Sequence, residues 1–136
     1  MNIALIAHDA KKEMMIQLCI AYKRILGEHN LYATAKTGKL VADATGLDIV
    51  KFLSGDQGGD QQIAAKISWN EIDMVLYFKD PNHPTRQENE QHDNNIIRLC
   101  DLNNIAIATN MATAEVLIHG LERGDLDWRE IVRNSK

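Results

Sequence analysis

Short apolar runs alternate along the chain with segments in which apolar side chains recur every three or four residues. The runs lie at 3–7, 31–34, 49–53, 72–78 and 105–109. A short apolar run that leads directly into a helical pattern is typical of a strand buried on both faces of a sheet. We therefore expect five such strands.

Helical patterns fill the intervals between these runs. The first extends from Met14 to Leu26 and is followed by Gly27, a residue type that commonly ends helices. The other predicted helices are a short one that follows the polar turn 35–38 and ends near Gly46, and those at 63–67, 96–100, 113–120 and 127–134. Five alternations of strand and helix predict an α/β fold: a single three-layer domain over residues 1–136, with a five-stranded, mostly parallel sheet and helices on both faces.

Composition narrows the class of protein. The chain has 136 residues, with 15 Lys and Arg against 19 Asp and Glu, and a formal net charge of −4. This length suffices for one domain that buries its core without a disulfide or a metal. The acidic balance argues against binding nucleic acid by bulk phosphate neutralisation. No apolar run approaches the roughly 20 residues that span a membrane, so we expect no membrane partner.

The cysteines and the N-terminal segment indicate a reducing compartment. Cys19 and Cys100 lie among apolar neighbours in helical patterns, and two cysteines are too few for a disulfide framework. We therefore expect buried free thiols. Residues 1–9 carry neither a basic segment nor a cleavage-site pattern, which predicts the first strand of a cytoplasmic protein.

Polar or glycine-rich residues follow each predicted strand. They are His8 with Asp9, residues 34–38, residues 54–60, Lys79 with Asp80, and Thr109 and Asn110 with Thr113. In open parallel sheets, ligands bind beyond the carboxyl ends of the strands. We therefore predict one polar pocket that all five strand ends build.

Other ligand sites on such sheets lack their residues here. The chain has no G-x-G-x-x-G after the first strand and no G-x-x-x-x-G-K-[ST], which argues against a dinucleotide site and a P-loop. A phosphoacceptor receiver domain could use Asp9 and Asp56. It would also need a lysine at the fifth strand end, where Thr109 and Asn110 stand.

The residues at this rim favour an anion. Thr34, Thr37 and Ser54 offer hydroxyl donors, and Lys12, Lys36 and Lys39 supply positive charge. The backbone can approach a ligand closely at four glycines, which are Gly38, Gly55, Gly58 and Gly59. The segments after the second and third strands lead into helix N-termini, which attract phosphate. The alternative is that the hydroxyls serve as turn and cap residues alone.

Carboxylates at the same rim suggest acid–base chemistry. Asp9, Asp60 and Asp80 each end a strand or begin a helix. A carboxyl group beside like charges in a pocket poor in water can act as a base toward a proton α to a carbonyl. Asp60 could also be a helix cap. His8 could polarise the carbonyl or fill a structural role, and the residues leave both open.

The chain resembles the methylglyoxal synthase family from residue 2 to about residue 133. The matching strings are Ile6-Ala7-His8-Asp9, Tyr32-Ala33-Thr34 with Thr37-Gly38, Leu53-Ser54-Gly55 with Gly58-Gly59-Asp60-Gln61-Gln62, Asp80-Pro81, and Ala108-Thr109-Asn110 with Ala112-Thr113-Ala114-Glu115. The segment from Leu53 to Gln62 is the most specific of these strings.

The resemblance implies a lyase that converts dihydroxyacetone phosphate to methylglyoxal and inorganic phosphate, a bypass of glycolysis. It further implies a homohexamer, phosphate as a ligand or inhibitor, and no metal or organic cofactor. By this resemblance Asp60 is the catalytic base, which forms an enediol(ate) phosphate, His8 contacts the substrate oxygens, and Asp80 is a supporting carboxylate. The implied phosphate ligands are Lys12, Thr34, Ala35, Lys36, Thr37, Ser54 and Gly55.

The chain departs from the family pattern in three places. Where the family has the turn Thr-Gly-Thr-Thr-Gly, this chain has Thr34-Ala35-Lys36-Thr37-Gly38, so that Lys36 replaces a hydroxyl with a charge. Asp56 stands where the family has proline. The family also places a functional histidine in the loop after Asp80. Counts from the two flanks put Asn89 or Gln87 at that position, and we expect His92 to supply the imidazole.

These departures keep a second hypothesis open, a non-catalytic module of the same fold that binds a phosphate metabolite. Such modules occur as effector domains of larger enzymes such as carbamoyl phosphate synthetase. The resemblance also suggests that Arg129 or Arg133 reaches the site of a neighbouring subunit.

Overall fold

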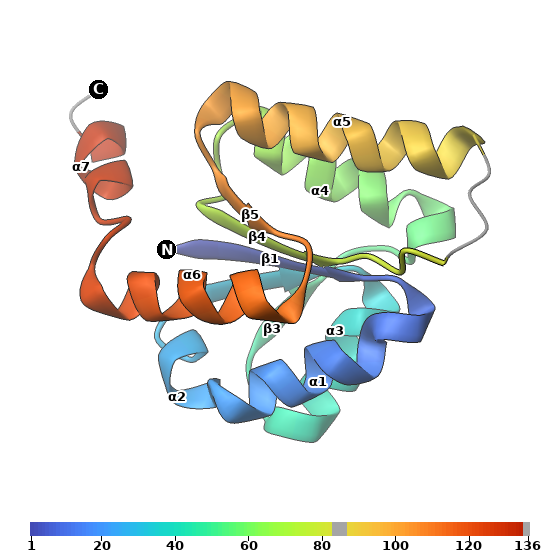
Figure 1. Ribbon diagram of the computed structural model, residues 1–136, viewed down its shortest axis with the longest axis horizontal. Helices are drawn as coiled ribbons and strands as arrows, with labels where there is room; N and C mark the ends of the chain where they lie inside the picture. Colours follow the sequence, from blue (N-terminus) through green and yellow to red (C-terminus); the bar gives the residue numbers. More distant parts are fainter. Residues whose placement is uncertain (83–86, 135–136) are drawn as a thin grey trace.

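Five strands form one parallel sheet in the order β3-β2-β1-β4-β5 (Figure 1). The computed structural model describes the backbone of residues 1–82 and 87–134 and the side chains of 1–82 and 93–134. The strands are β1 (Asn2–Ala7), β2 (Asn30–Ala33), β3 (Ile49–Lys51), β4 (Met74–Phe78) and β5 (Ala106–Ala108). Every neighbouring pair is parallel, which confirms the predicted sheet.

Helices connect each strand to the next, and two more follow the last strand. They are α1 (Lys12–Ala21), α2 (Lys23–Leu26), α3 (Ala35–Thr45), α4 (Gly59–Ser68), α5 (Gln87–Asn103), α6 (Met111–Arg123) and α7 (Trp128–Asn134), with 3₁₀ turns η1 (Asp9–Lys11) and η2 (Gly55–Gln57). Within the described residues, no helix is both long and apolar enough to cross a membrane.

The helices cover both faces of the sheet and complete three layers (Figure 1). Side chains alternate along β1, so that Leu5 belongs to an apolar cluster with side chains of α1, α2, α3 and α6, whereas Ile6 belongs to a cluster with side chains of α4 and α5. Two apolar clusters result, one on each face. This arrangement confirms the predicted three-layer α/β fold.

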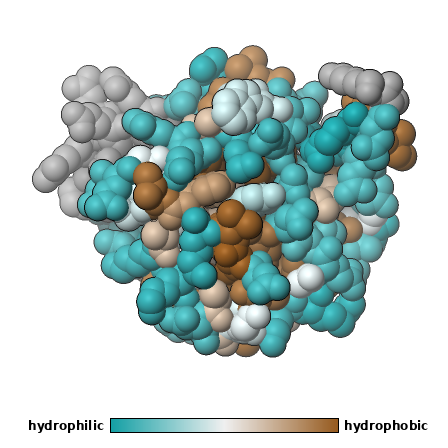
Figure 2. All heavy atoms as spheres, turned by 180° about the vertical axis from the view of Figure 1, so that it is seen from behind, coloured by the Kyte–Doolittle hydropathy of each residue, from teal (hydrophilic) through white to brown (hydrophobic). Residues whose placement is uncertain are grey.

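Hydrophilic residues cover most of the face that is seen from behind. Hydrophobic side chains gather near the middle of this face, and a few more lie at its margins (Figure 2). The edge strand β3 and the segment after it leave Val50 and Leu53 about half exposed, at 51% each.

The order of the strands reverses between β1 and β4. The chain builds outward from β1 to β3, and then returns to the other side of β1 to add β4 and β5. The N–H of His8 donates to the carbonyl of Phe78 at 3.0 Å, which continues the pairing beyond β1. His8 therefore lies at the switch point, where open α/β sheets bind their ligands.

Helices α3 and α5 begin well before their predicted starts. The polar turn 35–38 is the first turn of α3, where a side chain at Gly38 would come within 2.9 Å of Lys51, so this glycine serves close packing of helix and strand. Helix α5 begins at Gln87, well before the predicted helix at 96–100. The sequence analysis missed this start because the first turns of α5 carry no apolar stripe.

Candidate active site

A cavity of about 390 Å³ opens at the carboxyl end of the sheet, beside the switch point. Its lining residues are Ile6, Ala7, His8, Asp9, Lys12, Thr34, Lys36, Ser54, Gly55, Asp56, Asp60, Tyr77 and Asp93. The segments after β1, β2 and β3 contribute most of them. The structure thus brings together seven of the predicted site residues, which are His8, Lys12, Thr34, Lys36, Ser54, Gly55 and Asp60.

Lys12 begins α1 and turns its ammonium group back toward the strand ends. Its Nζ donates to the carbonyl of Ala7 at 2.7 Å and to Oγ1 of Thr37 at 3.1 Å. Burial lowers the pKa of Lys12, and the neighbouring carboxylate of Asp9 opposes that shift. Thr37 is buried and lies outside the lining, so it supports Lys12 from behind.

A second lysine approaches the cavity from α3. The Nζ atoms of Lys36 and Lys12 each lie 3.5 Å from Oδ1 of Asp9, and the two ammonium groups lower the pKa of that carboxyl. The side chain of Lys36 is 66% exposed. The N–H of Ala35 donates to the carbonyl of Leu53 at 3.3 Å, which joins the starts of the two loops.

Asp60 lies on the first turn of α4, and two glycines set its position. Gly58 has a φ of +101°, a left-handed conformation that glycine adopts without strain. A side chain at Gly59 would overlap the carbonyl group of Leu53, so the loop and the helix can approach this closely only at glycine. The Asp60 carboxylate lies against Gly55, where an added Cβ would be 3.4 Å from Oδ2.

Asp56 changes the hydrogen bonding of the loop between β3 and α4. The Ser54 hydroxyl donates to Oδ1 of Asp56 at 2.7 Å. This donor is therefore directed at a carboxylate of its own loop. Asp56 also adds a negative charge to the lining of the cavity.

The backbone fixes the proton arrangement of His8. The N–H of Asp80 donates to Nδ1 of His8 at 2.9 Å, so the neutral imidazole carries its own proton on Nε2. That Nε2 lies 3.7 Å from Oδ2 of Asp93. The ring edge also packs against Tyr77, with the ring centroids 5.7 Å apart.

Asp93 and Tyr77 are site residues that the sequence analysis missed. Asp93 is 8% exposed on α5, and its Oδ1 accepts a hydrogen bond from the Tyr77 hydroxyl. Asp93 precedes Ile96 by three residues and Cys100 by seven, which places a carboxylate on the buried face of an amphipathic helix. That spacing, with a tyrosine inside the apolar run of β4, was the available signal, because both groups need partners when buried.

The prediction of one pocket from all five strand ends is wrong for the residues that follow β4 and β5. Lys79, Asp80, Thr109 and Asn110 line a separate cavity of about 460 Å³. The Asp80 carboxylate accepts the N–H of Asn82 at 2.9 Å, whereas its backbone N–H contacts His8. The break arises because β4 and β5 lie on the other side of β1 from β2 and β3.

His92 lies in the first turns of α5, and its side chain is outside the described residues, as is His83. Among the residues that the structure does describe, no group of three or more His, Cys, Asp or Glu is placed to hold a metal ion.

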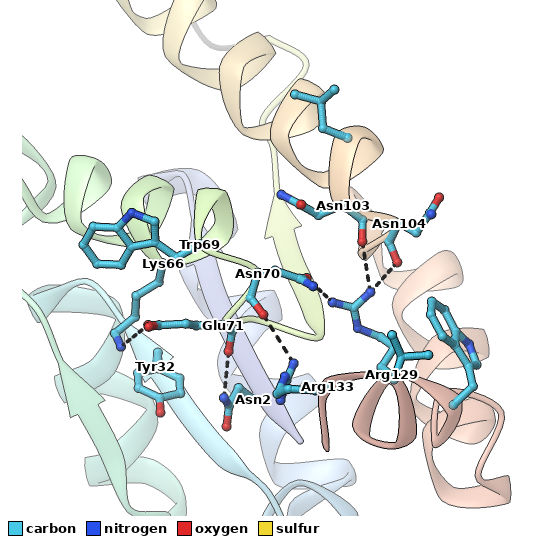
Figure 3. A pocket seen from close by; sticks show the side chains of 13 residues that line it. Asn2, Tyr32, Lys66, Trp69, Asn70, Glu71, Asn103, Asn104, Arg129 and Arg133 are labelled. Carbon is cyan, nitrogen blue, oxygen red and sulfur yellow. Dashed lines mark hydrogen bonds and ion pairs between the residues drawn. The ribbon is translucent and has the colours of Figure 1, made fainter. Parts of the chain in front are cut away.

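Both C-terminal arginines lie at the opposite end of the sheet, beside a cavity of about 600 Å³ (Figure 3). Arg129 is buried and donates to the carbonyls of Asn103 and Asn104 at 3.1 and 2.7 Å. Its Nε donates to Asp73 at 3.0 Å, and Arg133 contacts the same carboxylate. Within the chain, therefore, both arginines bind groups at the end of the sheet that lies opposite the candidate active site.

Comparisons with known proteins agree on one family. The family model of the MGS-like domain matches residues 14–109. Methylglyoxal synthase of Caldicellulosiruptor saccharolyticus is 59% identical over 132 residues, 97% of this chain and 92% of the relative. That of Geobacillus sp. (strain WCH70) is 54% identical over 136 residues, 100% of this chain and 96% of the relative. A crystal structure of methylglyoxal synthase from Elizabethkingia anophelis NUHP1 superposes with a TM-score of 0.76 at 35% identity, and covers 86% of this chain and 76% of that one.

Proposed function

The chain belongs to the methylglyoxal synthase family, and from that premise we propose that it converts dihydroxyacetone phosphate to methylglyoxal and inorganic phosphate. The observation that carries the proposal is the Asp60 carboxylate, which lines the same cavity as two lysines and two helix starts. The cavity therefore combines a base with groups that attract a phosphate ester.

The phosphoryl group would bind between the loops that follow β2 and β3. Within the described residues, the side chain of neither Thr34 nor Ser54 caps the helix that it precedes. First-turn N–H groups of a helix have no partner inside the helix, and they favour anions. Lys12 supplies a charge that the Ala7 carbonyl and the Thr37 hydroxyl hold in place.

Asp60 would remove a proton from the hydroxymethyl carbon next to the ketone. The electron pair of the broken C–H bond moves into the bond between that carbon and the ketone carbon, and the ketone oxygen becomes an enediolate oxygen. A donor at this oxygen stabilises the developing charge. Nε2 of His8 supplies such a donor, because Nδ1 already accepts from Asp80.

The enediolate phosphate would then break its C–O bond to phosphate. The terminal enediol hydroxyl gives up its proton and its oxygen forms an aldehyde, the carbon–carbon double bond shifts to the neighbouring pair of carbons, and phosphate departs with the electron pair of the broken bond and takes up a proton. The enolate that remains takes a proton on its terminal carbon and becomes methylglyoxal. The Lys12 ammonium and the helix starts stabilise the charge that grows on the departing phosphate.

The test replaces Asp60 by asparagine, which keeps the shape and removes the base. We expect Asp60→Asn to bind inorganic phosphate and to lose at least about a hundredfold in kcat, because a positioned general base typically contributes 10²–10⁴. A colorimetric assay measures methylglyoxal after dihydroxyacetone phosphate is added. Asp43→Asn, which removes an exposed carboxylate of α3, is the matched control and should keep full turnover.

Two results would contradict the proposal. Unchanged turnover of Asp60→Asn would exclude this carboxylate as the base. Tight phosphate binding by the parent chain without product would support the second hypothesis, a phosphate-metabolite-binding module of the same fold.

We extend the proposal to the assembly and its setting. The family resemblance supports a homohexamer of single-domain subunits in the cytoplasm, in which phosphate acts as ligand or inhibitor. Sedimentation equilibrium measures the assembly directly, and a monomer at micromolar concentration would contradict it.

A further inference from the structure

We propose, building on the function above, that Tyr77 is a positioning residue whose hydroxyl holds the Asp93 carboxylate against the Nε2 side of His8. The three side chains come from separate elements, since Tyr77 belongs to β4, Asp93 to α5 and His8 to the segment after β1. All three line the candidate active site.

The geometry assigns one role to each carboxylate oxygen. Oδ1 of Asp93 accepts the Tyr77 hydroxyl, and Oδ2 lies 3.7 Å from Nε2 of His8. A carboxylate that accepts a hydrogen bond on one oxygen loses rotational freedom about its side chain. The other oxygen therefore keeps a fixed direction toward the imidazole.

The surroundings strengthen the hydrogen bond from the Tyr77 hydroxyl to the Asp93 carboxylate. Tyr77 is 3% exposed and Asp93 is 8% exposed, so water competes weakly for either group. Burial of the phenol and the adjacent Asp93 carboxylate raise the pKa of Tyr77, which therefore remains a donor throughout the physiological range.

The arrangement orients His8 from both sides. The Asp80 N–H occupies Nδ1 and sets the tautomer, while Asp93 faces the Nε2 that would donate to the substrate oxygen. The hydroxyl of Tyr77 acts only through Asp93 in this scheme, whereas the ring also packs against His8. Its contribution should therefore appear in the chemical step and not in substrate affinity.

Tyr77→Phe removes a single oxygen and keeps the buried ring. We expect kcat to fall about tenfold, the size that loss of a hydrogen bond to a charged group produces, with KM changed less than about twofold. Tyr32→Phe is the matched control, because Tyr32 stacks on Phe52 outside the active-site cavity, and it should keep the parent kcat. Thermal unfolding verifies that both variants fold.

A double-variant cycle separates positioning from simple packing. If Tyr77 acts through Asp93, then Tyr77→Phe combined with Asp93→Asn should be no slower than Asp93→Asn alone. Multiplied losses in the double variant, or a parent kcat in Tyr77→Phe, would overturn the proposal.

A spectroscopic measurement answers the question without turnover. The Nε2 proton resonance of His8, identified by its loss in His8→Asn, should move upfield in Tyr77→Phe as its carboxylate neighbour loses its fixed direction. An unmoved resonance would overturn the positioning role. If the parent chain makes no methylglyoxal, the function fails, and this measurement still decides the role of Tyr77.

Discussion

At the scale of single residues, Asp56 works against the anion that the cavity should bind. Its carboxylate accepts the Ser54 hydroxyl at 2.7 Å and thereby diverts a donor from the loop that begins the proposed phosphate site. Lys36 has the opposite effect, since it brings a positive charge to the same lining. The two positions that depart from the family pattern therefore compensate in charge.

Asp56→Ala should tighten the binding of inorganic phosphate. The substitution removes a negative charge and releases the Ser54 hydroxyl, so we expect the Kd to fall about fivefold at low salt, as for one partly screened charge a few ångströms away. Isothermal titration calorimetry measures this change. Lys36→Met should weaken binding by a similar factor, and a rise of Kd in Asp56→Ala would contradict the charge argument.

The sequence predicted the cavity-lining residues that follow strands better than those that reach the cavity from a covering helix. His8, Ser54 and Asp60, which line the cavity, were predicted there because they follow a strand end or a glycine pattern. Asp93 was not, because its spacing to Ile96 and Cys100 indicates a buried carboxylate without indicating which groups it meets. Its partners are distant in sequence and meet it only in the folded chain.

At the scale of elements, the short helix α7 is held by a buried ion cluster. Asp73 is fully buried and accepts from the N–H of Asn2 and from both Arg129 and Arg133. Nη1 of Arg129 donates to two backbone carbonyls at the end of α5, and Nη2 donates to the Asn70 side chain and to the carbonyl of Ile72. One arginine thus ties α7 to the strand and helix ends at this edge.

Arg129→Met should lower the free energy of unfolding by about 3–5 kcal/mol, because it leaves the Asp73 charge buried with one partner fewer. Urea denaturation measures the change. Arg123→Met breaks an exposed ion pair with Asp125, and this control should change stability little. An equal effect of the two substitutions would show that the buried cluster does not stabilise α7.

Element boundaries followed the apolar pattern only where a pattern existed. Gly46 ends α3 in a left-handed conformation with φ of +75°, as the sequence predicted. The start of α5 was misplaced, because its first turns consist of polar residues that a helix tolerates as readily as a loop does. Helix propensity without amphipathicity is a weak signal.

At the scale of the whole molecule, the two layers of helices bury one thiol each. Cys19 belongs to the cluster under α1, and Cys100 belongs to the cluster under α5. Both are free and buried, as predicted from their apolar neighbours. Burial raises the pKa of each thiol from 9.0 to about 12.

The buried thiols should link stability to alkaline pH. A group whose pKa is raised by folding stabilises the native state below its unfolded pKa, so this contribution is present below pH 9.0 and is lost as pH rises toward about 12. Denaturant titrations between these values measure the decline. The variant Cys19→Ala/Cys100→Ala should decline less steeply, and equal slopes would contradict the linkage.

The architecture as a whole was the most predictable feature. Five apolar runs separated by helices allow few arrangements, because parallel strands need crossover connections of one hand. The strand order could not be predicted in the same way. It depends on which edge of β1 receives β4, and that choice rests on contacts between distant segments.

The hydrogen bond from the Asp80 N–H to His8 comes from the main chain. A saturation library at position 80 would thus remove the carboxylate from every variant but glutamate and still preserve the amide donor in all but the proline variant. A tolerant mutational profile at this position would therefore conceal the importance of the backbone N–H, and a selective failure of proline would reveal it. Replacing that one amide by an ester during chemical synthesis would erase the donor while leaving the aspartate side chain intact.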